Sequence, residues 1–370
     1  MNILHIYKSY YPFTIGGIEM HIQSLTASLR SKNIECSILT TQKAPEVFKC
    51  QINNTPVFYY PSRIEFASCP ISFKLLRDFN NLIKDYDILH YHFPWPFADF
   101  TRVLTSVNKP IVVTYHSDIL RQKYLKLFYY PLMRFFLNRS NIIIASSQNY
   151  LQSSSVLKKY SSKVKVIPFG LDKSKYPIPE MDLLKFWKDK VGENFFLFVG
   201  VLRYYKGLDF LLEAVKNTNI PVVIAGSGPE ETKLAKIKQE KNINNVRFVG
   251  KITDLDKAAL YQLSRATVVP SHLRAEAFCI SLLESLIYNR PAISTELNTG
   301  TSFVNQHNLS GLVVPPANPE ALRQAMLVLL NNETLYQQLK TGTALHYHQY
   351  FSINNMRDHH IQLYEGLLRR

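Results

Sequence analysis

Short runs of β-branched and aliphatic residues alternate with amphipathic helical stretches along most of this chain. In the first half these strand-like runs are Ile3–Tyr7, Cys36–Thr40, Ile88–His92, Ile111–Tyr115, Asn141–Ala145 and Val164–Ile167. Between the first two runs, apolar residues recur at helical spacing, at Ile18, Ile22, Leu25 and Leu29. This alternation is typical of sheets whose parallel strands are connected by helices, so it predicts an α/β fold.

The alternation restarts near residue 190. The later strand-like runs are Phe195–Val201, Val222–Ala225, Val246–Val249, Thr267–Pro270 and Ala292–Ser294, with helical stretches at 208–215, 229–241, 255–264 and 279–288. A chain of 370 residues, 46% of them hydrophobic, is long enough for two globular domains. We predict two Rossmann-like domains facing a central cleft, at 1–172 and 190–345, joined by a linker at 173–189 and followed by a C-terminal helical segment at 346–370.

Positive charge is concentrated in the first half of the chain. The net charge is +15, and residues 1–185 carry 23 Lys and Arg against 12 Asp and Glu. This excess indicates an anionic partner, such as a lipid surface or nucleic acid, or only a solvated basic face. No Lys/Arg tract of the nucleic-acid-binding type is present.

Localisation is predicted from the cysteines and from the apolar runs. The four cysteines form no CxxC pair, so free thiols in a reducing cytosol are expected. No apolar run approaches the ~18 residues of a membrane span. The N-terminus resembles a first strand and not a signal peptide. We expect a cytoplasmic protein, peripheral on the inner face of the plasma membrane.

Candidate ligand-binding residues follow the predicted strands, because ligands of such sheets lie at the carboxyl ends of the strands. Gly16-Gly17 opens the first helix, where free N–H groups suit a phosphate, although a plain turn also explains the pair. Arg203 and Lys206 lie three residues apart in a loop that opens a helix. Two such cations suit a diphosphate, and a solvated loop is the alternative.

Two further motifs lie in the second half. The Gly226-Ser227-Gly228-Pro229 loop can abut a nucleotide, or it is simply a tight turn. Glu276 and Glu284 are eight residues apart, about two helical turns, and Glu284 interrupts an apolar helix. A buried carboxylate needs a partner, which ribose hydroxyls or a salt bridge would supply.

Together these motifs resemble those of the retaining glycosyltransferases of family 4, which have the GT-B fold. The four motifs occur in the family's order over nearly the whole chain. Thr114–Asp118 also resembles the family's acceptor-side histidine loop, and Val166–Asp172 resembles its segment before the linker. The chain departs from the family at Ala277 and Cys279, where glycines are usual, and at Phe169, where asparagine is usual. A Thr299–Ser302 segment stands in place of a usual glycine pair.

The resemblance implies metal-independent sugar transfer with retention of anomeric configuration, with no cofactor besides the nucleotide-diphosphate sugar. The first domain would bind a glycan or polyprenyl-linked acceptor of bacterial surface-polysaccharide assembly, and the second a donor such as GDP-linked mannose or a deoxy relative. The last helix would cross back to the first domain. Catalytic roles are implied for His116, Arg203, Lys206 and Glu276. Donor or nucleotide contacts are implied for Gly16, Gly17, Arg203, Lys206, Gly226, Gly228, Phe278, Cys279, Ile280 and Glu284.

Metal binding is not expected. Asp85 and Asp87 spell a DxD motif, but they precede a strand and so lie at the wrong end of the sheet. His90 and His92 share one face of a strand, with no third ligand evident from the sequence. Four later histidines are expected on the surface of the C-terminal helices, at His346, His348, His359 and His360.

The segment at 119–139 suggests membrane contact. It contains five Lys and Arg, no acidic residue and many aromatic side chains, and Pro131 is expected to break its helix in two. Lys123, Lys126 and Arg134 would cluster on one side and meet anionic headgroups, or the segment is a core helix with outward-pointing cations. The alternative functions are another enzyme on this scaffold, either a sugar-nucleotide epimerase or a phosphorylase, or, in a different class, a basic nucleic-acid-binding protein.

Overall fold

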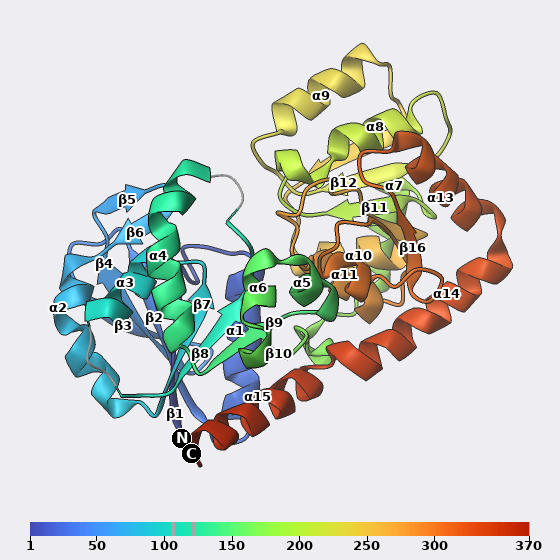
Figure 1. Cartoon of the computed structure of the whole chain (residues 1–370). Helices are drawn as coiled ribbons and strands as arrows, with labels where there is room; N and C mark the ends of the chain where they lie inside the picture. The colour runs from blue at the N-terminus through green and yellow to red at the C-terminus, as the bar shows by residue number, and fades with distance from the viewer. Residues whose placement is uncertain (105–107, 120–122, 370) are drawn as a thin grey trace. The chain divides into compact units, whose positions relative to one another are not determined.

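The computed structural model describes residues 1–104, 108–119 and 123–369, and of residues 123–126 it describes the backbone alone. The chain forms two compact units, which Figure 1 shows coloured from the N-terminus to the C-terminus. The first unit comprises Met1–Leu171 together with Ile353–Arg370, and the second comprises Asp172–Ser352.

The first unit is built on an eight-stranded sheet with the order β10-β9-β8-β7-β1-β2-β4-β3. All neighbours pair in parallel except β3 and β4, which form an antiparallel hairpin at the edge. The strands are β1 (Asn2–Ile6), β2 (Glu35–Gln42), β3 (Phe48–Ile52), β4 (Thr55–Pro61), β7 (Ile88–Phe93), β8 (Ile111–Tyr115), β9 (Ile142–Ala145) and β10 (Val164–Val166). A separate two-stranded ribbon consists of β5 (Ile64–Phe66) and β6 (Cys69–Ile71).

Helices connect these strands. They are α1 (Gly17–Arg30), α2 (Phe73–Leu82), α3 (Pro96–Leu104), α4 (Lys123–Arg139), α5 (Gln148–Ser153) and α6 (Ser155–Lys159), and the last helix of the chain, α15 (Ile353–Leu368), also belongs to this unit. Apolar side chains of α1 and α15 join strand residues in one core cluster, including Leu25, Leu29, Met356 and Tyr364. The α15 helix therefore completes the core of the first unit.

The second unit has a six-stranded, fully parallel sheet with the order β13-β12-β11-β14-β15-β16. Its strands are β11 (Phe196–Val199), β12 (Val222–Ala225), β13 (Val246–Gly250), β14 (Ala266–Val269), β15 (Ala292–Thr295) and β16 (Gly311–Val314). Its helices are α7 (Met181–Val191), α8 (Leu208–Val215), α9 (Glu231–Glu240), α10 (Asp254–Leu263), α11 (Ile280–Ile287), α12 (Thr301–Val304), α13 (Pro319–Asn331) and α14 (Glu333–His346), followed by a π-helical turn at Tyr347–Phe351. Two core clusters contain apolar residues of this sheet and of its helices.

Two details differ from the sequence-based expectations. Much of the stretch expected as a linker, 173–189, lies in α7, whose buried Trp187 packs in a core cluster of the second unit and donates a hydrogen bond to Asp256 at 2.9 Å. The α4 helix continues through Pro131 and is not broken there. A proline removes only one backbone hydrogen-bond donor. After Pro131, the buried side chains of Met133 and Phe136 keep the helix packed in the first unit.

Candidate active site

The sheet topology of the second unit brings two predicted site loops together. The chain runs outward from β11 to β13 on one side, and from β14 to β16 on the other. The order therefore reverses between the neighbouring strands β11 and β14, and ligands of open parallel sheets bind at the carboxyl ends of the strands at such a reversal. Lys206 follows β11 and Glu276 follows β14, so both lie at this point.

Lys206 and Glu276 form a buried ion pair. The Lys206 Nζ lies 2.5 Å from Glu276 Oε2, which also accepts a hydrogen bond from Ser271 Oγ at 2.9 Å. The two residues are 9% and 6% exposed. Burial alone lowers the pKa of Lys206, but the Glu276 carboxylate more than offsets this and raises the pKa above its usual value. The Lys206 ammonium therefore stays charged near neutral pH.

The backbone around Lys206 requires glycine. Gly207 has φ +66°, and a Cβ there would lie 2.1 Å from the Pro270 carbonyl oxygen, so no larger residue fits. This close approach ties the Lys206 turn to the end of β14. Arg203, three residues earlier, has an exposed side chain and extended backbone. The structure thus separates the two predicted phosphate-binding cations into one buried and one exposed group.

The Gly226–Pro229 loop packs directly on the loop after β11. A Cβ on Gly226 would lie 1.9 Å from the Gly200 carbonyl oxygen, and one on Gly228 would lie 2.5 Å from the Leu202 carbonyl oxygen. These contacts explain both glycines by packing alone. Their predicted contact with a nucleotide stays a prediction.

Glu284 is buried in α11 with protein partners. Its Oε1 lies 2.6 Å from Lys257 Nζ on α10, and its Oε2 accepts a hydrogen bond from Tyr261 at 3.3 Å. Burial lowers and the Glu284 carboxylate raises the pKa of Lys257, which ends above its usual value. Glu284 therefore has the salt bridge that was named as the alternative to ribose hydroxyls. A carboxylate has about four acceptor positions, so ribose hydroxyls could still bind Glu284. Lys257 and Tyr261 could not be identified from the sequence, because only their contacts with α11 in the folded unit reveal them.

The backbone between Glu276 and Glu284 is strained at Cys279. Cys279 has φ +71°, in the region that favours glycine, and its buried side chain lies 3.1 Å from Ser281 Oγ. Burial raises the pKa of this thiol to about 11. Phe278 is buried, while Ile280 begins α11 and is half-buried. A Cβ on Gly300 would lie 2.6 Å from the Phe278 ring, so the loop after β15 closes on this segment.

In the first unit, Gly16 and Gly17 begin α1 beside a carboxylate. A Cβ on Gly16 would lie 2.7 Å from Glu19 Oε2, and the buried Glu19 accepts a hydrogen bond from Ser9 Oγ at 2.8 Å. A phosphate bound at this helix start would face that carboxylate. The predicted phosphate contact therefore has an electrostatic obstacle that the sequence analysis did not consider.

His116 lies at the carboxyl end of β8 within a cluster of buried histidines. Its Nε2 lies 2.9 Å from His92 Nδ1, and His92 Nε2 lies 3.0 Å from His5 Nδ1. The parallel register of β1 and β7 pairs His5 with His90. His5, His90 and His92 could together offer nitrogens to a metal, so the structure places beside the pair a third possible ligand that was not evident from the sequence; that no metal binds there stays a prediction.

Two of the histidines expected on the surface are buried. His360 on α15 is 1% exposed and lies with its ring 6.0 Å from that of His90, so it extends the same cluster. His346 on α14 is also 1% exposed and hydrogen-bonds the Phe303 carbonyl oxygen in the second unit. His359 is exposed as expected. The helices bury one face, and periodicity alone did not show which face that is.

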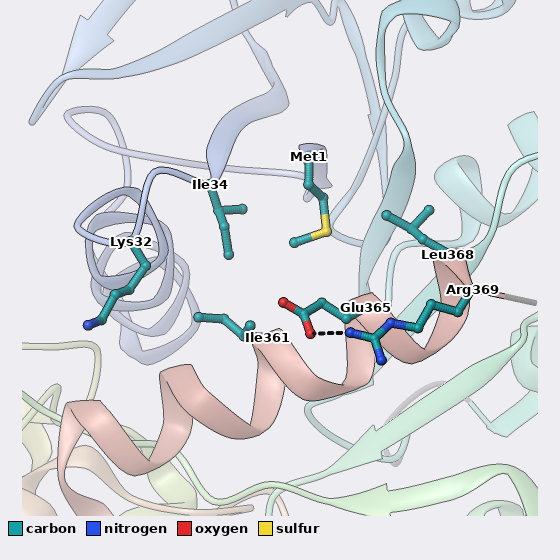
Figure 2. Close-up of a pocket in the computed structure, with 7 residues that line it drawn as sticks. All are labelled: Met1, Lys32, Ile34, Ile361, Glu365, Leu368 and Arg369. Atoms are coloured by element: carbon teal, nitrogen blue, oxygen red, sulfur yellow. Dashed lines mark hydrogen bonds and ion pairs between the residues drawn. The ribbon is translucent and has the colours of Figure 1, made fainter.

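Two features lie at the opposite, amino-terminal end of the first sheet. Asp87 precedes β7 and accepts a hydrogen bond from the Asn2 backbone at 2.8 Å, which agrees with the expectation that the DxD motif lies away from the ligand end. Figure 2 shows an open pocket formed near the N-terminus by Met1, Lys32, Ile34, Ile361, Glu365, Leu368 and Arg369. It is not near any predicted site residue.

Two family models match the chain. One described as Glycosyltransferase Family 4 matches residues 15–175, and one described as Glycosyl transferases group 1 matches residues 182–345. The chain is 45% identical to D-rhamnosyltransferase WbpZ of Pseudomonas aeruginosa, over 95% of this chain and 92% of that protein. It is 43% identical to O-antigen chain mannosyltransferase C of Escherichia coli, over 100% and 99%.

Solved structures agree with this assignment at the level of the fold. A sucrose-phosphate synthase of Thermosynechococcus elongatus matches with a TM-score of 0.81 and 19% identity, over 100% of this chain and 99% of that one. HepE of Anabaena in complex with UDP matches with a TM-score of 0.80 and 17% identity, over 99% and 100%. The epimerase alternative has no support among these matches. The chain is a glycosyltransferase that belongs to family 4 and has the GT-B fold.

Proposed function

We propose that this enzyme transfers mannose, or its 6-deoxy form rhamnose, from a GDP-linked donor to a glycan of a bacterial surface polysaccharide, with retention of anomeric configuration and without a metal ion. The names of the two bacterial relatives support the sugar and the polysaccharide, since one is a D-rhamnosyltransferase and the other an O-antigen chain mannosyltransferase. The second unit binds the donor, and the first binds the acceptor.

The observation that carries the proposed chemistry is the buried pair of Lys206 and Glu276. An ammonium has three donors, so Lys206 can hold Glu276 and still bind the diphosphate that leaves the sugar. The exposed Arg203 adds a bidentate contact from the same loop. These two cations supply the positive charge that a metal ion supplies in other transferases.

Glu276 accepts hydrogen bonds from hydroxyls of the donor sugar, and Ser271 and Lys206 orient its carboxylate for this task. Glu284 accepts from the ribose, fixed in place by Lys257 and Tyr261. Backbone groups of the Gly226–Gly228 and Phe278–Ile280 segments contact the nucleotide sugar. His116 contacts the substrate in the first unit, where its Nδ1 has no protein partner among the residues that the structure describes.

The donor is tested by thermal shift with a panel of nucleotide sugars, because ligand at 100 times its Kd stabilises a protein by about 2.7 kcal/mol. GDP-mannose or GDP-rhamnose should raise the unfolding temperature more than UDP-glucose at equal concentration. A preference for the UDP sugar would contradict the proposed donor. The anomeric configuration of the transferred sugar, measured by NMR on the product, tests retention.

The first unit also docks on an anionic membrane surface that carries a lipid-linked acceptor. Supporting this, Leu127 and Phe128 on α4 are 72% and 82% exposed, and α3, which packs on α4, adds the exposed Phe100 and Leu104. Arg134 is exposed further along α4. Within the described residues, no helix combines the length and the apolar character needed to cross a bilayer.

The side chains of Lys123 and Lys126 lie outside the described residues, so their predicted cluster with Arg134 stays a prediction. Each cation near an anionic surface contributes about 1 kcal/mol, and salt weakens the attraction. Co-sedimentation should therefore require vesicles with anionic lipid and should decrease at high salt. Phe128→Ser should weaken it, whereas Ile178→Ser, which changes an equally exposed side chain of the second unit, should not. If the protein does not co-sediment with anionic vesicles at low salt, this result would favour an acceptor that is free in solution.

A further inference from the structure

Six buried histidines lie on β1, β7, α1 and α15 and directly after β8; Figure 1 shows α1 and α15, which contact each other, beside the first sheet. Each is at most 4% exposed, and no acidic side chain hydrogen-bonds to any of them within the described part of the chain. They are His5 on β1, His21 on α1, His90 and His92 on β7, His116 after β8 and His360 on α15. The proposed function uses only His116 of this set.

Three of the rings form a continuous hydrogen-bonded chain. His116 Nε2 bonds with His92 Nδ1 at 2.9 Å, and His92 Nε2 bonds with His5 Nδ1 at 3.0 Å. Both nitrogens of the central ring, His92, are therefore used. Among the described residues, the two end atoms, His116 Nδ1 and His5 Nε2, have no partner in the protein.

The chain allows only two arrangements of protons. A neutral imidazole has one N–H and one lone pair, so each ring must donate at one nitrogen and accept at the other. Burial lowers the pKa of His5 and of His116 to about 3, which keeps these rings neutral near pH 7. All three rings must consequently carry the proton on the same nitrogen, either Nδ1 or Nε2.

The surroundings of the two ends distinguish these arrangements. With protons on Nε2, the unpaired N–H belongs to His5, which is fully buried; the neighbouring His360 does not hydrogen-bond to it. With protons on Nδ1, the unpaired N–H belongs to His116, at the carboxyl end of β8 where a ligand can accept it. Either arrangement leaves one buried N–H without a protein partner among the described residues. The second arrangement places it on His116, which is 4% exposed against 0% for His5 and lies at the ligand end of the sheet, so the second arrangement is favoured. His21, whose ring lies 5.4 Å from that of His116, also has ring nitrogens unpaired within the described structure.

We propose that His92 and His5 are positioning residues that hold His116 as its Nδ1–H tautomer. His116 then donates a hydrogen bond to a substrate oxygen and does not act as a base. The binding of a substrate at His116 rests on the proposed function. The tautomer of His116 does not, because it is a property of the free protein. The assignment follows the general rule that the bond made by one ring nitrogen decides where the proton sits on the other.

A metal bound by His5, His90 and His92 is the competing use of the cluster. It would have to break one of the two hydrogen bonds of His92, whose nitrogens bond with His5 and His116. It would also have to displace a partner of His90, whose nitrogens bond with Tyr364 and Thr114, each at 2.7 Å. The hydrogen-bonded chain satisfies these atoms without an ion, so the structure favours it.

Long-range proton–nitrogen NMR on the full chain, with ¹⁵N-labelled histidine and after EDTA treatment, reads the tautomer directly. The resonances that disappear in His116→Gln belong to His116 and should show a protonated Nδ1 and a bare Nε2. Protonated Nε2, a charged ring at pH 7 or a metal-shifted nitrogen would each overturn the proposal. The measurement needs no substrate, so it can fail while the proposed sugar transfer stands.

Variants at the far end of the chain test the coupling to catalysis. His5→Leu removes the donor to His92 and should lower kcat on the order of tenfold with little change in the KM for the nucleotide sugar. His5→Asn can donate from an amide near the former Nδ1 and should restore most of kcat. His359→Leu, which alters an exposed histidine, is the matched control. Equal losses in His5→Leu and His5→Asn would show that His5 only fills space.

Discussion

The buried histidines make the first unit sensitive to mild acid. Burial lowers the pKa of His5 and His116 to about 3 and that of His360 to about 4, and it holds His21, His90 and His92 well below the usual value. In the unfolded chain these rings have a pKa of about 6.5. Between pH 6.5 and about 4 the unfolded chain therefore binds protons that the folded unit excludes, so stability is full above pH 6.5 and decreases as the pH falls.

The size of the effect follows from the number of rings. Each ring that stays neutral only when folded lowers the free energy of unfolding by about 1.4 kcal/mol per pH unit. The three rings with a pKa of about 3 to 4 together contribute about 4 kcal/mol per unit, and all six about 8 kcal/mol. Whole domains are stable by only about 5–15 kcal/mol, so the first unit should unfold near pH 5.

Urea titrations between pH 7.5 and 5 measure this slope. The chain has two tryptophans, so in Trp187→Phe the fluorescence of the buried Trp95 reports the first unit alone. His360→Asn should reduce the slope by about 1.4 kcal/mol per pH unit, whatever it does to stability at pH 7.5. His359→Asn, one residue earlier and exposed, should not. A urea midpoint that is constant down to pH 5, or an unchanged slope in His360→Asn, would refute the reasoning.

Four further predictions concern the second unit. Glu276→Gln should lower kcat on the order of 10²–10³-fold in a folded protein, and near-normal turnover would contradict its assigned role. Lys206→Ala should weaken the binding of both donor and nucleoside diphosphate product by calorimetry, since the cation contacts phosphate in both; unchanged product affinity would count against it. Sugar transfer should persist in EDTA. If EDTA stopped the transfer and magnesium restored it, the assignment of the phosphate site would be wrong. Cys279→Gly should relieve the strain at φ +71° and raise the free energy of unfolding by about 1 kcal/mol, read from the urea midpoint.

Most of the parallel strands could be predicted from the sequence because each of those is a short apolar run that alternates with helical stretches. The β3–β4 hairpin was missed. The edge strand β3, FKCQI, lacks a clear apolar run, whereas β4, TPVFYYP, contains the run Val57–Tyr60, which was not used. The turn of this hairpin did carry a signal, because Asn53 and Asn54 both have positive φ, which asparagine tolerates in tight hairpins. The short β16 was also missed.

The candidate site could be predicted only where one segment holds the chemistry. The motifs identified Lys206 and Glu276 singly, but the ion pair between them depends on the adjacency of β11 and β14. Glu284 was identified, whereas its partner Lys257 belongs to another helix, 27 positions away. The histidine chain could not be predicted from spacing, because it requires the register of β7 with both β1 and β8.

Because α15 belongs to the first unit, that unit is interrupted by an entire second unit inserted between Leu171 and Ile353. During synthesis its sheet emerges from the ribosome long before the helix that supplies Met356, His360 and Tyr364 to its core. At about 5–20 residues per second, the roughly 200 residues from Leu171 to the end of α15 take about 10–40 s to make. Throughout that time the nascent sheet exposes an apolar, histidine-rich face. The inserted unit is continuous and can fold before the first unit is complete. The order of folding is then opposite to the order in which the two units begin, and a chaperone has a defined surface to protect until α15 emerges.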